Sequence, residues 1–158
     1  MNTINNHVLR SLRYTLDLND QQMVEIFRLA DPETPVDARA VTAMLRRDED
    51  EGFLPCSGAD LSSFLDGLIV KRRGPDPRGA ARTPASSINN NLIMKKLRVA
   101  FELKDLDLLR IFDGIGFAVS KPELSAFFRQ PDHRNYRSCG DQILRQFLQG
   151  LTKWVRPA

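Results

Sequence analysis

Metal-ligating residue types are few and scattered in this sequence. The best candidate ligands are Cys56, Cys139, His7 and His133, and the two cysteines lie 83 positions apart. Neither a C-x-x-C nor an H-E-x-x-H pattern is present, and these spacings mark zinc sites. The acidic run at residues 48–51 could attract a hard cation, but it is more typical of a solvated helix end. We therefore predict no metal site and no cofactor.

A cysteine nucleophile is the next candidate chemistry. Cys139 stands in the sequence Ser-Cys-Gly-Asp, where the start of a helix could lower the pKa of a thiol. Cys56 occupies the equivalent place in the first half of the chain, followed by Ser57 and Gly58. A residue written twice in different surroundings favours packing over catalysis, so we predict two buried thiols. With no Ser/His/Asp arrangement visible either, we predict no catalytic residues and no enzyme.

Nucleic-acid binding is the sharpest remaining hypothesis. Residues 108–129 read LLRIFDGIGFAVSKPELSAFFR, which outlines an apolar helix, a glycine-containing turn, a serine cap and a second helix. This order is typical of a helix-turn-helix, although the turn is longer than the usual three or four residues. Basic residues on these helices and on nearby segments could contact phosphates. The candidate nucleic-acid-binding residues are Lys95, Lys96, Arg98, Lys121, Arg129, Arg134 and Arg137.

A plain helical hairpin with a solvated basic face is the alternative interpretation. The protein would then be a protein–protein interaction module or a homo-oligomerising adaptor with no nucleic-acid role. Trp154, near the chain end, could dock between the two halves or at a dimer surface. Tandem helical units commonly serve this purpose, so both hypotheses stay open.

The charge is divided unevenly between the halves of the 158-residue chain. Residues 1–74 hold 9 Lys/Arg and 12 Asp/Glu, a net of −3, whereas residues 88–158 hold 12 and 7, a net of +5. Such a dipole can steer an anionic partner to one end, or promote head-to-tail self-association. The surplus is modest beside dedicated nucleic-acid binders, so it permits that function without requiring it.

The sequence contains one helical unit twice. Residues 5–27 align with 90–112 with 8 identities in 23, and residues 36–68 align with 119–151 with 9 identities in 33. The matched positions are mainly apolar, so the duplication preserves a core pattern. Residues 74–87 between the copies hold three prolines, two glycines and no large apolar residue, a composition typical of a linker.

Each copy is expected to form four helices, because the apolar spacing follows a period of 3.6 and no segment alternates with a period of two. The first helices cover about 6–16 and 91–102, with Asn5 and Asn90 as caps. The second begin at Asp20 and Asp105, and the third run over about 37–47 and 121–129. Ser120 and Glu123 form a capping box. Apolar stripes mark the fourth helices: Leu61, Phe64, Leu65, Leu68 and Ile69, then Leu144, Phe147, Leu148, Leu151 and Val155.

A shared segment precedes the fourth helix of each copy. Gly52 and Asn135 occupy one equivalent position, which suggests a backbone site with positive φ. Phe53 and Tyr136 follow them, and we expect each aromatic ring to fill the core of its unit.

Four segments carry a resemblance to a known family. They are EDEGFLPC (49–56), LSSFLDGLIVKRRG (61–74), INNNLIMKKLRVAFELK (88–104) and PDHRNYRSCGDQILRQFLQGL (131–151). The chain resembles the bacterial YehS family, a duplicated domain of unknown function, over nearly its whole length. The resemblance implies a fold built on the repeat and supplies no functional residues.

We predict an all-α fold of two tandem homologous units of about four helices each, with helix-turn-helix-like hairpins and a pseudo-two-fold arrangement. The units span 1–73 and 88–158, joined by a linker at 74–87. The sequence shows no secretory signal and no long apolar stretch, so we expect a cytoplasmic protein without a membrane span. The predicted function is a non-enzymatic, regulatory binding module.

Overall fold

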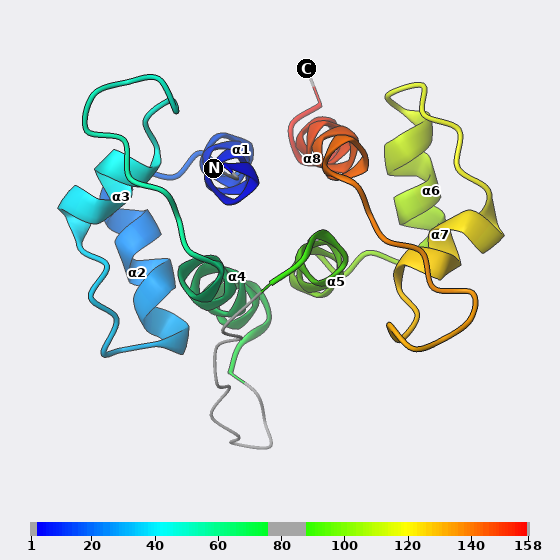
Figure 1. Ribbon diagram of the computed structural model, residues 1–158, viewed down its shortest axis with the longest axis horizontal. Coiled ribbons are helices and arrows are strands. Elements are labelled where there is room, and N and C mark those ends of the chain that lie inside the picture. Colours follow the sequence, from blue (N-terminus) through cyan, green and yellow to red (C-terminus); the bar gives the residue numbers. More distant parts are fainter. Residues whose placement is uncertain (1–2, 76–87, 158) are drawn as a thin grey trace. The chain divides into compact units, whose positions relative to one another are not determined.

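The computed structural model describes residues 3–75 and 88–157, and all regular secondary structure in these residues is helical. Two compact units, Met1–Ile88 and Asn89–Ala158, each fold on themselves. Unit one contains α1 (Ile4–Thr15), α2 (Asp20–Ala30), α3 (Ala38–Met44) and α4 (Gly58–Arg73) (Figure 1). Unit two contains α5 (Asn90–Ala100), α6 (Asp105–Asp113), α7 (Lys121–Phe127) and α8 (Asp141–Val155). The predicted all-α fold of two tandem four-helix units is confirmed.

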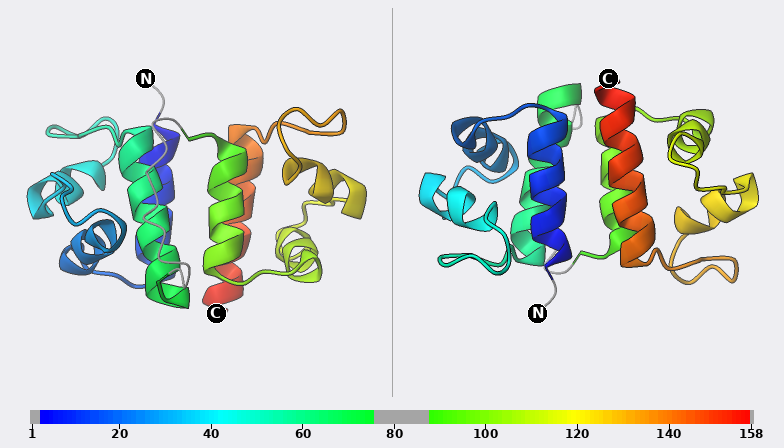
Figure 2. Two further views of the ribbon diagram at one scale, coloured as in Figure 1. Left: turned by 90° about the horizontal axis from the view of Figure 1, so that it is seen from below. Right: turned by 90° about the horizontal axis from the view of Figure 1, so that it is seen from above.

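Within each unit the first and last helices lie side by side, and the second helix packs against the last (Figure 2). Of the predicted linker at 74–87, only Gly74 and Pro75 belong to the described residues, and the rest lies outside them. No helix in residues 3–75 and 88–157 has both the length and the apolar character needed to cross a bilayer.

Equivalent side chains fill the two cores. The ring centroids of Phe27 and Phe64 are 5.0 Å apart in unit one, and those of Phe112 and Phe147 are 5.7 Å apart in unit two. All four rings are fully buried. The predicted apolar stripes of α4 and α8 are buried as well, except that Val155 is half-buried near the end of its helix. The duplication is therefore a duplication of packing, as the identities predicted.

A glycine in the last helix of each unit allows a close helix crossing. A Cβ atom added to Gly67 would lie 1.8 Å from the carbonyl oxygen of Ile26, and one added to Gly150 would lie 2.7 Å from that of Ile111. Such distances are far inside van der Waals contact, so no side chain fits at either position. The identity of Gly67 with Gly150 thus reflects the crossing of α4 with α2 and of α8 with α6.

The turn after the first helix is also duplicated. Asp17 has φ of 52° and Glu102 has φ of 55°, and these are the non-glycine residues with positive φ in the described chain. The Leu18 N–H donates to the Arg13 carbonyl at 2.9 Å, and Leu103 repeats this bond in unit two. This bond is the long-range hydrogen bond of a Schellman motif, which requires the left-handed residue before it.

Local sequence signals located several helix ends correctly. The second helices begin at Asp20 and Asp105, and a capping box joins Ser120 to Glu123 at the start of α7, as predicted. The third helices are shorter than predicted, at 38–44 and 121–127. Carbonyl groups of their last turns bond to the loop that follows, since Ala43 accepts from the Leu54 N–H and Ala126 from the Arg137 N–H.

Two predictions about the segment before the fourth helix are wrong. Gly52 has a positive φ of 82°, but Asn135 is not among the residues with positive φ, so the two loops differ in backbone conformation at this point. Phe53 and Tyr136 are half-buried at the edge of their units and do not fill the cores. Phenylalanines from the second and fourth helices occupy the core centres instead.

Candidate nucleic-acid interface

A buried asparagine near the start of α1 holds the loop between α3 and α4. The Asn6 side-chain amide donates to the carbonyl oxygens of Met44 and Leu54, both at 2.9 Å. The Asn6 side-chain oxygen accepts from the Cys56 N–H at 3.0 Å. Asn6 is fully buried, and all three bonds go to main-chain atoms. One side chain thereby joins the first helix, the end of the third helix and the loop.

Unit two repeats this arrangement bond for bond. The Asn91 amide donates to the carbonyl oxygens of Phe127 at 3.0 Å and Arg137 at 2.8 Å. Its oxygen accepts from the Cys139 N–H at 2.8 Å. We call these two arrangements the asparagine clamps, with Asn6 and Asn91 at their centres.

The prediction that Asn5 and Asn90 cap their helices is wrong. Helix α1 begins before Asn5, and the cap of α5 is Asn89, whose side chain accepts from the Leu92 N–H at 2.8 Å. The Asn5 and Asn90 amides instead donate to the carbonyl oxygens of Cys56 and Cys139, at 3.0 and 3.1 Å. These bonds support the clamps from the neighbouring helix position.

The clamped loops carry opposite charge. The loop of residues 45–57 has two Arg and four Asp/Glu, a net of −2, whereas the equivalent 128–140 has three Arg and one Asp, a net of +2. Both loops have 13 residues. The same framework therefore presents an acidic loop in unit one and a basic loop in unit two.

Four of the seven predicted nucleic-acid-binding residues are exposed, and their side chains make no hydrogen bond or ion pair within the described chain. They are Lys95, Lys121, Arg129 and Arg134. Lys121 is the first residue of α7 and Arg129 follows the helix, whose buried residues are Leu124 and Phe127. Lys96 is half-buried and has an interaction of its own.

Arg98 is committed to the fold. Its guanidinium donates to the Leu103 carbonyl at 3.1 Å and to the Asp105 carboxylate at 2.7 Å. It also lies 4.9 Å from the centroid of the Phe128 ring, a cation–π distance. Arg13 and Asp20 form the equivalent ion pair in unit one, at 3.4 Å. Arg98 thus closes the turn between α5 and α6, a role that its identity with Arg13 signalled.

Arg137 is also partly engaged. Its guanidinium lies 3.5 Å from a carboxylate oxygen of Glu123 and 5.4 Å from the centroid of the Phe127 ring. Hydrogen bonds with Ser120, together with the charge of Arg137, lower the pKa of Glu123. Both partners of this pair are about half exposed, so the pair is weak and Arg137 remains accessible.

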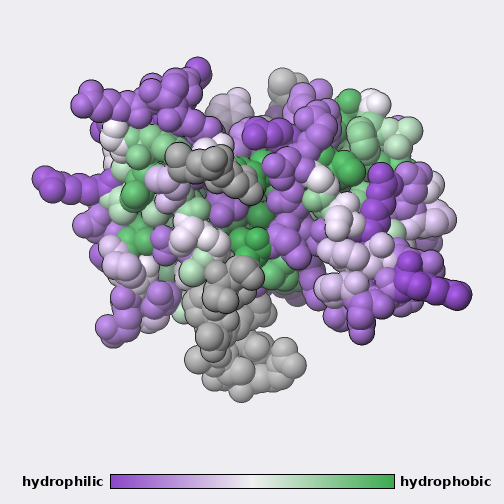
Figure 3. Space-filling view, viewed as in Figure 1, coloured by the Kyte–Doolittle hydropathy of each residue, from purple (hydrophilic) through white to green (hydrophobic). Residues whose placement is uncertain are grey.

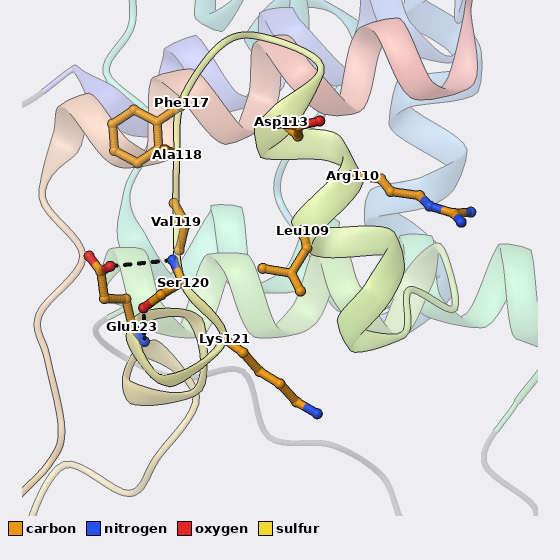
Figure 4. Close-up of a pocket in the computed structure, with 9 residues that line it drawn as sticks. All are labelled: Leu109, Arg110, Asp113, Phe117, Ala118, Val119, Ser120, Lys121 and Glu123. Atoms are coloured by element: carbon orange, nitrogen blue, oxygen red, sulfur yellow. Dashed lines mark hydrogen bonds between the residues drawn. The ribbon is translucent and has the colours of Figure 1, made fainter.

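The α6–α7 hairpin encloses a shallow, open cavity of about 580 Å³. Its apolar wall includes Leu109, Phe117 and Val119, and the Arg110 and Lys121 side chains extend from its edge (Figure 4). On the face shown in Figure 3, a hydrophobic patch lies over the loop that follows α6, with hydrophilic side chains around it. Arg110 was not among the predicted residues, although its place on the polar side of an amphipathic helix was a signal for it.

The hairpin turn between α6 and α7 spans residues 114–120, seven residues. A DNA-binding helix-turn-helix uses three or four residues and a longer second helix. The arrangement therefore supplies basic side chains on a helical hairpin rather than a full recognition helix.

The two cysteines are buried, as predicted. Burial, together with the charge of Asp60, raises the pKa of the Cys56 thiol to about 12. Burial and Asp141 raise the pKa of Cys139 to about 11. Both thiols are therefore protonated at neutral pH, the opposite of what a nucleophile needs. No group of three or more potential metal ligands comes together among residues 3–75 and 88–157.

Comparison with known proteins returns a duplicated match. A family model described as "Protein of unknown function (DUF1456)" matches residues 5–74 and again residues 90–156. The curated "Uncharacterized protein YehS" of Escherichia coli (strain K12) is 47% identical over 148 residues, which is 94% of each chain. No solved structure shows a significant match to the chain.

Proposed function

The chain belongs to the DUF1456 family, and from this starting point we propose that it is a non-enzymatic binding protein whose second unit binds nucleic acid. The charge of +5 on residues 88–158 supports an anionic partner. Phosphate contacts dominate the affinity of proteins for nucleic acids, so accessible cations are the first requirement.

The proposal rests on one observation: several basic side chains of unit two are exposed and have no partner within the described chain. The exposed side chains of Lys95, Lys121, Arg129 and Arg134 make no hydrogen bond or ion pair within the described chain. Arg110 adds a fifth at the edge of the hairpin cavity. A basic side chain with no internal partner can bind a phosphate without first losing a hydrogen bond or ion pair. The favourable electrostatic energy of the phosphate contact is therefore not reduced by such a loss.

Binding of this kind depends on the backbone of the nucleic acid more than on its base sequence. The seven-residue turn and the short α7 supply no long helix for the major groove. Contacts from Lys and Arg to phosphate oxygens position a protein but carry no sequence information. We therefore expect a similar affinity for oligonucleotides of different sequence.

The test is the binding of the full chain to labelled duplex and single-stranded oligonucleotides, followed by fluorescence anisotropy. Each phosphate contact contributes about −0.9 to the slope of log K against log salt for duplex DNA, so four contacts predict a slope of about −3.6. Reversal of charge in Lys95→Glu/Lys121→Glu should weaken binding uniformly across sequences. Absence of detectable binding at about 50 mM salt, where such contacts are strong, contradicts the proposal.

A protein partner is the second candidate function, and the exposed Trp154 favours it. Trp154 lies on α8 with 42% of its surface exposed, and tryptophan is enriched at protein interfaces. It is the single tryptophan of the chain, so its fluorescence reports on that surface alone. A concentration-dependent shift of its emission, matched by a dimer in sedimentation velocity, would support self-association, and a monomer with constant emission would exclude it.

A further inference from the structure

We propose that the contact surface for nucleic acid is the face formed by Lys95, Arg129 and Arg134, which we call the basic loop face. Its partner is the sugar–phosphate backbone. This inference rests on the proposed function and goes beyond it by assigning the contact to the clamped loop 128–140. The argument comes from comparing each residue with its equivalent in unit one.

In unit one the equivalent cations are satisfied internally. The Arg10 guanidinium donates to the Arg46 carbonyl at 2.9 Å and lies 3.8 Å from the Asp48 carboxylate. The Arg46 guanidinium donates to the Glu51 carbonyl at 2.6 Å. It lies so close to Gly52 that an added Cβ atom would be 2.6 Å from its Nη1. These arginines therefore fold back onto their own loop.

Unit two has basic residues at the same two positions, but the partners that bind the arginines in unit one have changed. Lys95 and Arg129 replace Arg10 and Arg46, while Pro131 replaces Asp48, the carboxylate partner. Asn135 replaces Gly52, against which the Arg46 guanidinium lies in unit one, and Asn135 lacks the positive φ of that glycine. The side chains of Lys95 and Arg129 make no hydrogen bond or ion pair within the described chain.

The loop of unit two also contains an additional basic residue. Arg134 stands where unit one has Glu51, and its side chain also makes no hydrogen bond or ion pair in the described part of the chain. Arg129 and Arg134 lie in one loop, and the contacts of Arg10 with Arg46 and Asp48 in unit one indicate that the equivalent Lys95 lies beside it. Like charges that are close together repel one another, and a polyanion removes that repulsion by placing phosphates between them. The Asn91 clamp fixes the main chain of this loop from inside the unit, so its cations are presented with little loop entropy to lose.

The first test neutralises the basic loop face in the full chain. Lys95→Gln/Arg129→Gln/Arg134→Gln changes exposed side chains only and should fold normally. We expect the affinity for a duplex oligonucleotide to fall at least about tenfold and the salt slope to become shallower by about 2.7, which is three phosphate contacts. An affinity and a slope equal to those of the unchanged protein would overturn the inference.

A matched control removes the same charge elsewhere in unit two. Lys104→Gln/Arg145→Gln/Lys153→Gln also neutralises three exposed cations, none of them within residues 128–140. We expect its affinity to fall less than about threefold, through the loss of long-range attraction only. Equal losses in the two triple variants would show that net charge acts rather than this face.

The second test releases the loop without changing any charge. Asn91→Ala removes the three bonds that hold loop 128–140, and Asn6→Ala removes the three equivalent bonds from the acidic loop 45–57. We expect Asn91→Ala to weaken nucleic-acid binding at least about fivefold and Asn6→Ala to leave it nearly unchanged. Equal effects of the two would contradict a role for loop 128–140, and if either variant fails to fold, the triple variants decide.

The two levels of the proposal can fail separately. If the unchanged protein binds no nucleic acid at about 50 mM salt, the proposed function and this inference both fail. If it binds and the basic-loop-face variant binds equally well, only the inference fails, and the cations at the hairpin cavity become the alternative contact.

Discussion

Single residues carry the clearest record of the duplication, and Asp17 and Glu102 give an example. Both adopt left-handed backbone conformations at the same turn, where an L side chain other than Asn or Asp costs about 1–2 kcal/mol. Glycine avoids this steric cost but loses more entropy on folding. The residue type thus conflicts with the conformation most strongly at Glu102.

We predict that Glu102→Gly stabilises the protein by about 1 kcal/mol, and that Asp17→Gly gives a smaller gain because aspartate tolerates the left-handed region. Urea denaturation measures both changes. Glu102→Ala serves as the control, because it removes the side chain but keeps the steric conflict, and it should not stabilise. A gain from alanine equal to that from glycine would show that the backbone conformation is not the cause.

The buried thiols make stability depend on alkaline pH. The pKa of Cys56 is raised from 9.0 to about 12 in the folded protein, so the unfolded chain releases this proton first. The contribution of the protonated thiol is fully present below pH 9 and is lost as pH rises toward 12. We predict that Cys56→Ala flattens the fall of unfolding free energy between about pH 9 and pH 11, measured by urea denaturation at each pH. An unchanged pH profile would contradict this assignment.

At the scale of elements, the crossing of the second and fourth helices organises each unit. Gly67 leaves α4 in direct contact with the main chain of α2 at Ile26, and Gly150 does the same for α8 and Ile111 with more space. A methyl group at either site must push two helices apart and strain the packed phenylalanines beside them.

We predict that Gly67→Ala destabilises the protein by about 3 kcal/mol or more and that Gly150→Ala costs less, about 1–3 kcal/mol. The order follows from the two distances, 1.8 and 2.7 Å, between an added Cβ atom and the facing carbonyl oxygen. Chemical denaturation of both variants gives the comparison. Gly140→Ala is a suitable control, since nothing lies within 4 Å of an added Cβ atom there.

The starts of the second helices and of α7, and the core faces, could be predicted from the sequence because their causes are local. Acidic residues at Asp20 and Asp105, the Ser120 capping box and the apolar stripes all act within a turn or two of the chain. The ends of α3 and α7 could not be predicted, because good helix formers such as Leu45 continue past them. Those ends are set by hydrogen bonds from residues far away in the sequence, above all from Asn6 and Asn91.

In the candidate interface, too, some features could be predicted from the sequence and others depend on the folded structure. The basic residues were visible in the sequence, but which of them are free was not, because Arg98 and Arg137 find partners only in the folded unit. The clamps also left a signal, since Asn5, Asn6, Asn90 and Asn91 are identical between the copies. The sequence alone favours capping, because capping is a common local role of asparagine.

At the scale of the whole molecule, two units with the same helical arrangement carry net charges of opposite sign. Residues 1–74 have a net charge of −3 and residues 88–158 a net charge of +5, and the clamped loops are a concentrated form of that difference. The pseudo-two-fold arrangement of the units and the division at residues 74–87 stay predictions.

We predict that binding can be copied from one unit to the other. Replacing residues 45–57 with the sequence of residues 128–140, together with Arg10→Lys, should give unit one a basic loop held by Asn6. The variant should bind two short oligonucleotides per chain where the unchanged protein binds one, as measured by isothermal titration calorimetry. A folded variant that still binds one would show that the loop alone does not make the contact surface.

In both asparagine clamps the three central hydrogen bonds go to main-chain atoms only, and this has a wider consequence. A bond to a carbonyl oxygen or an amide N–H is available whatever side chain the residue bears. Natural drift, or a combinatorial library, can therefore rewrite the solvent side of either 13-residue loop while its course is retained. A small helical protein of this kind would serve as a frame for displaying variable peptides, with two independent positions on one chain.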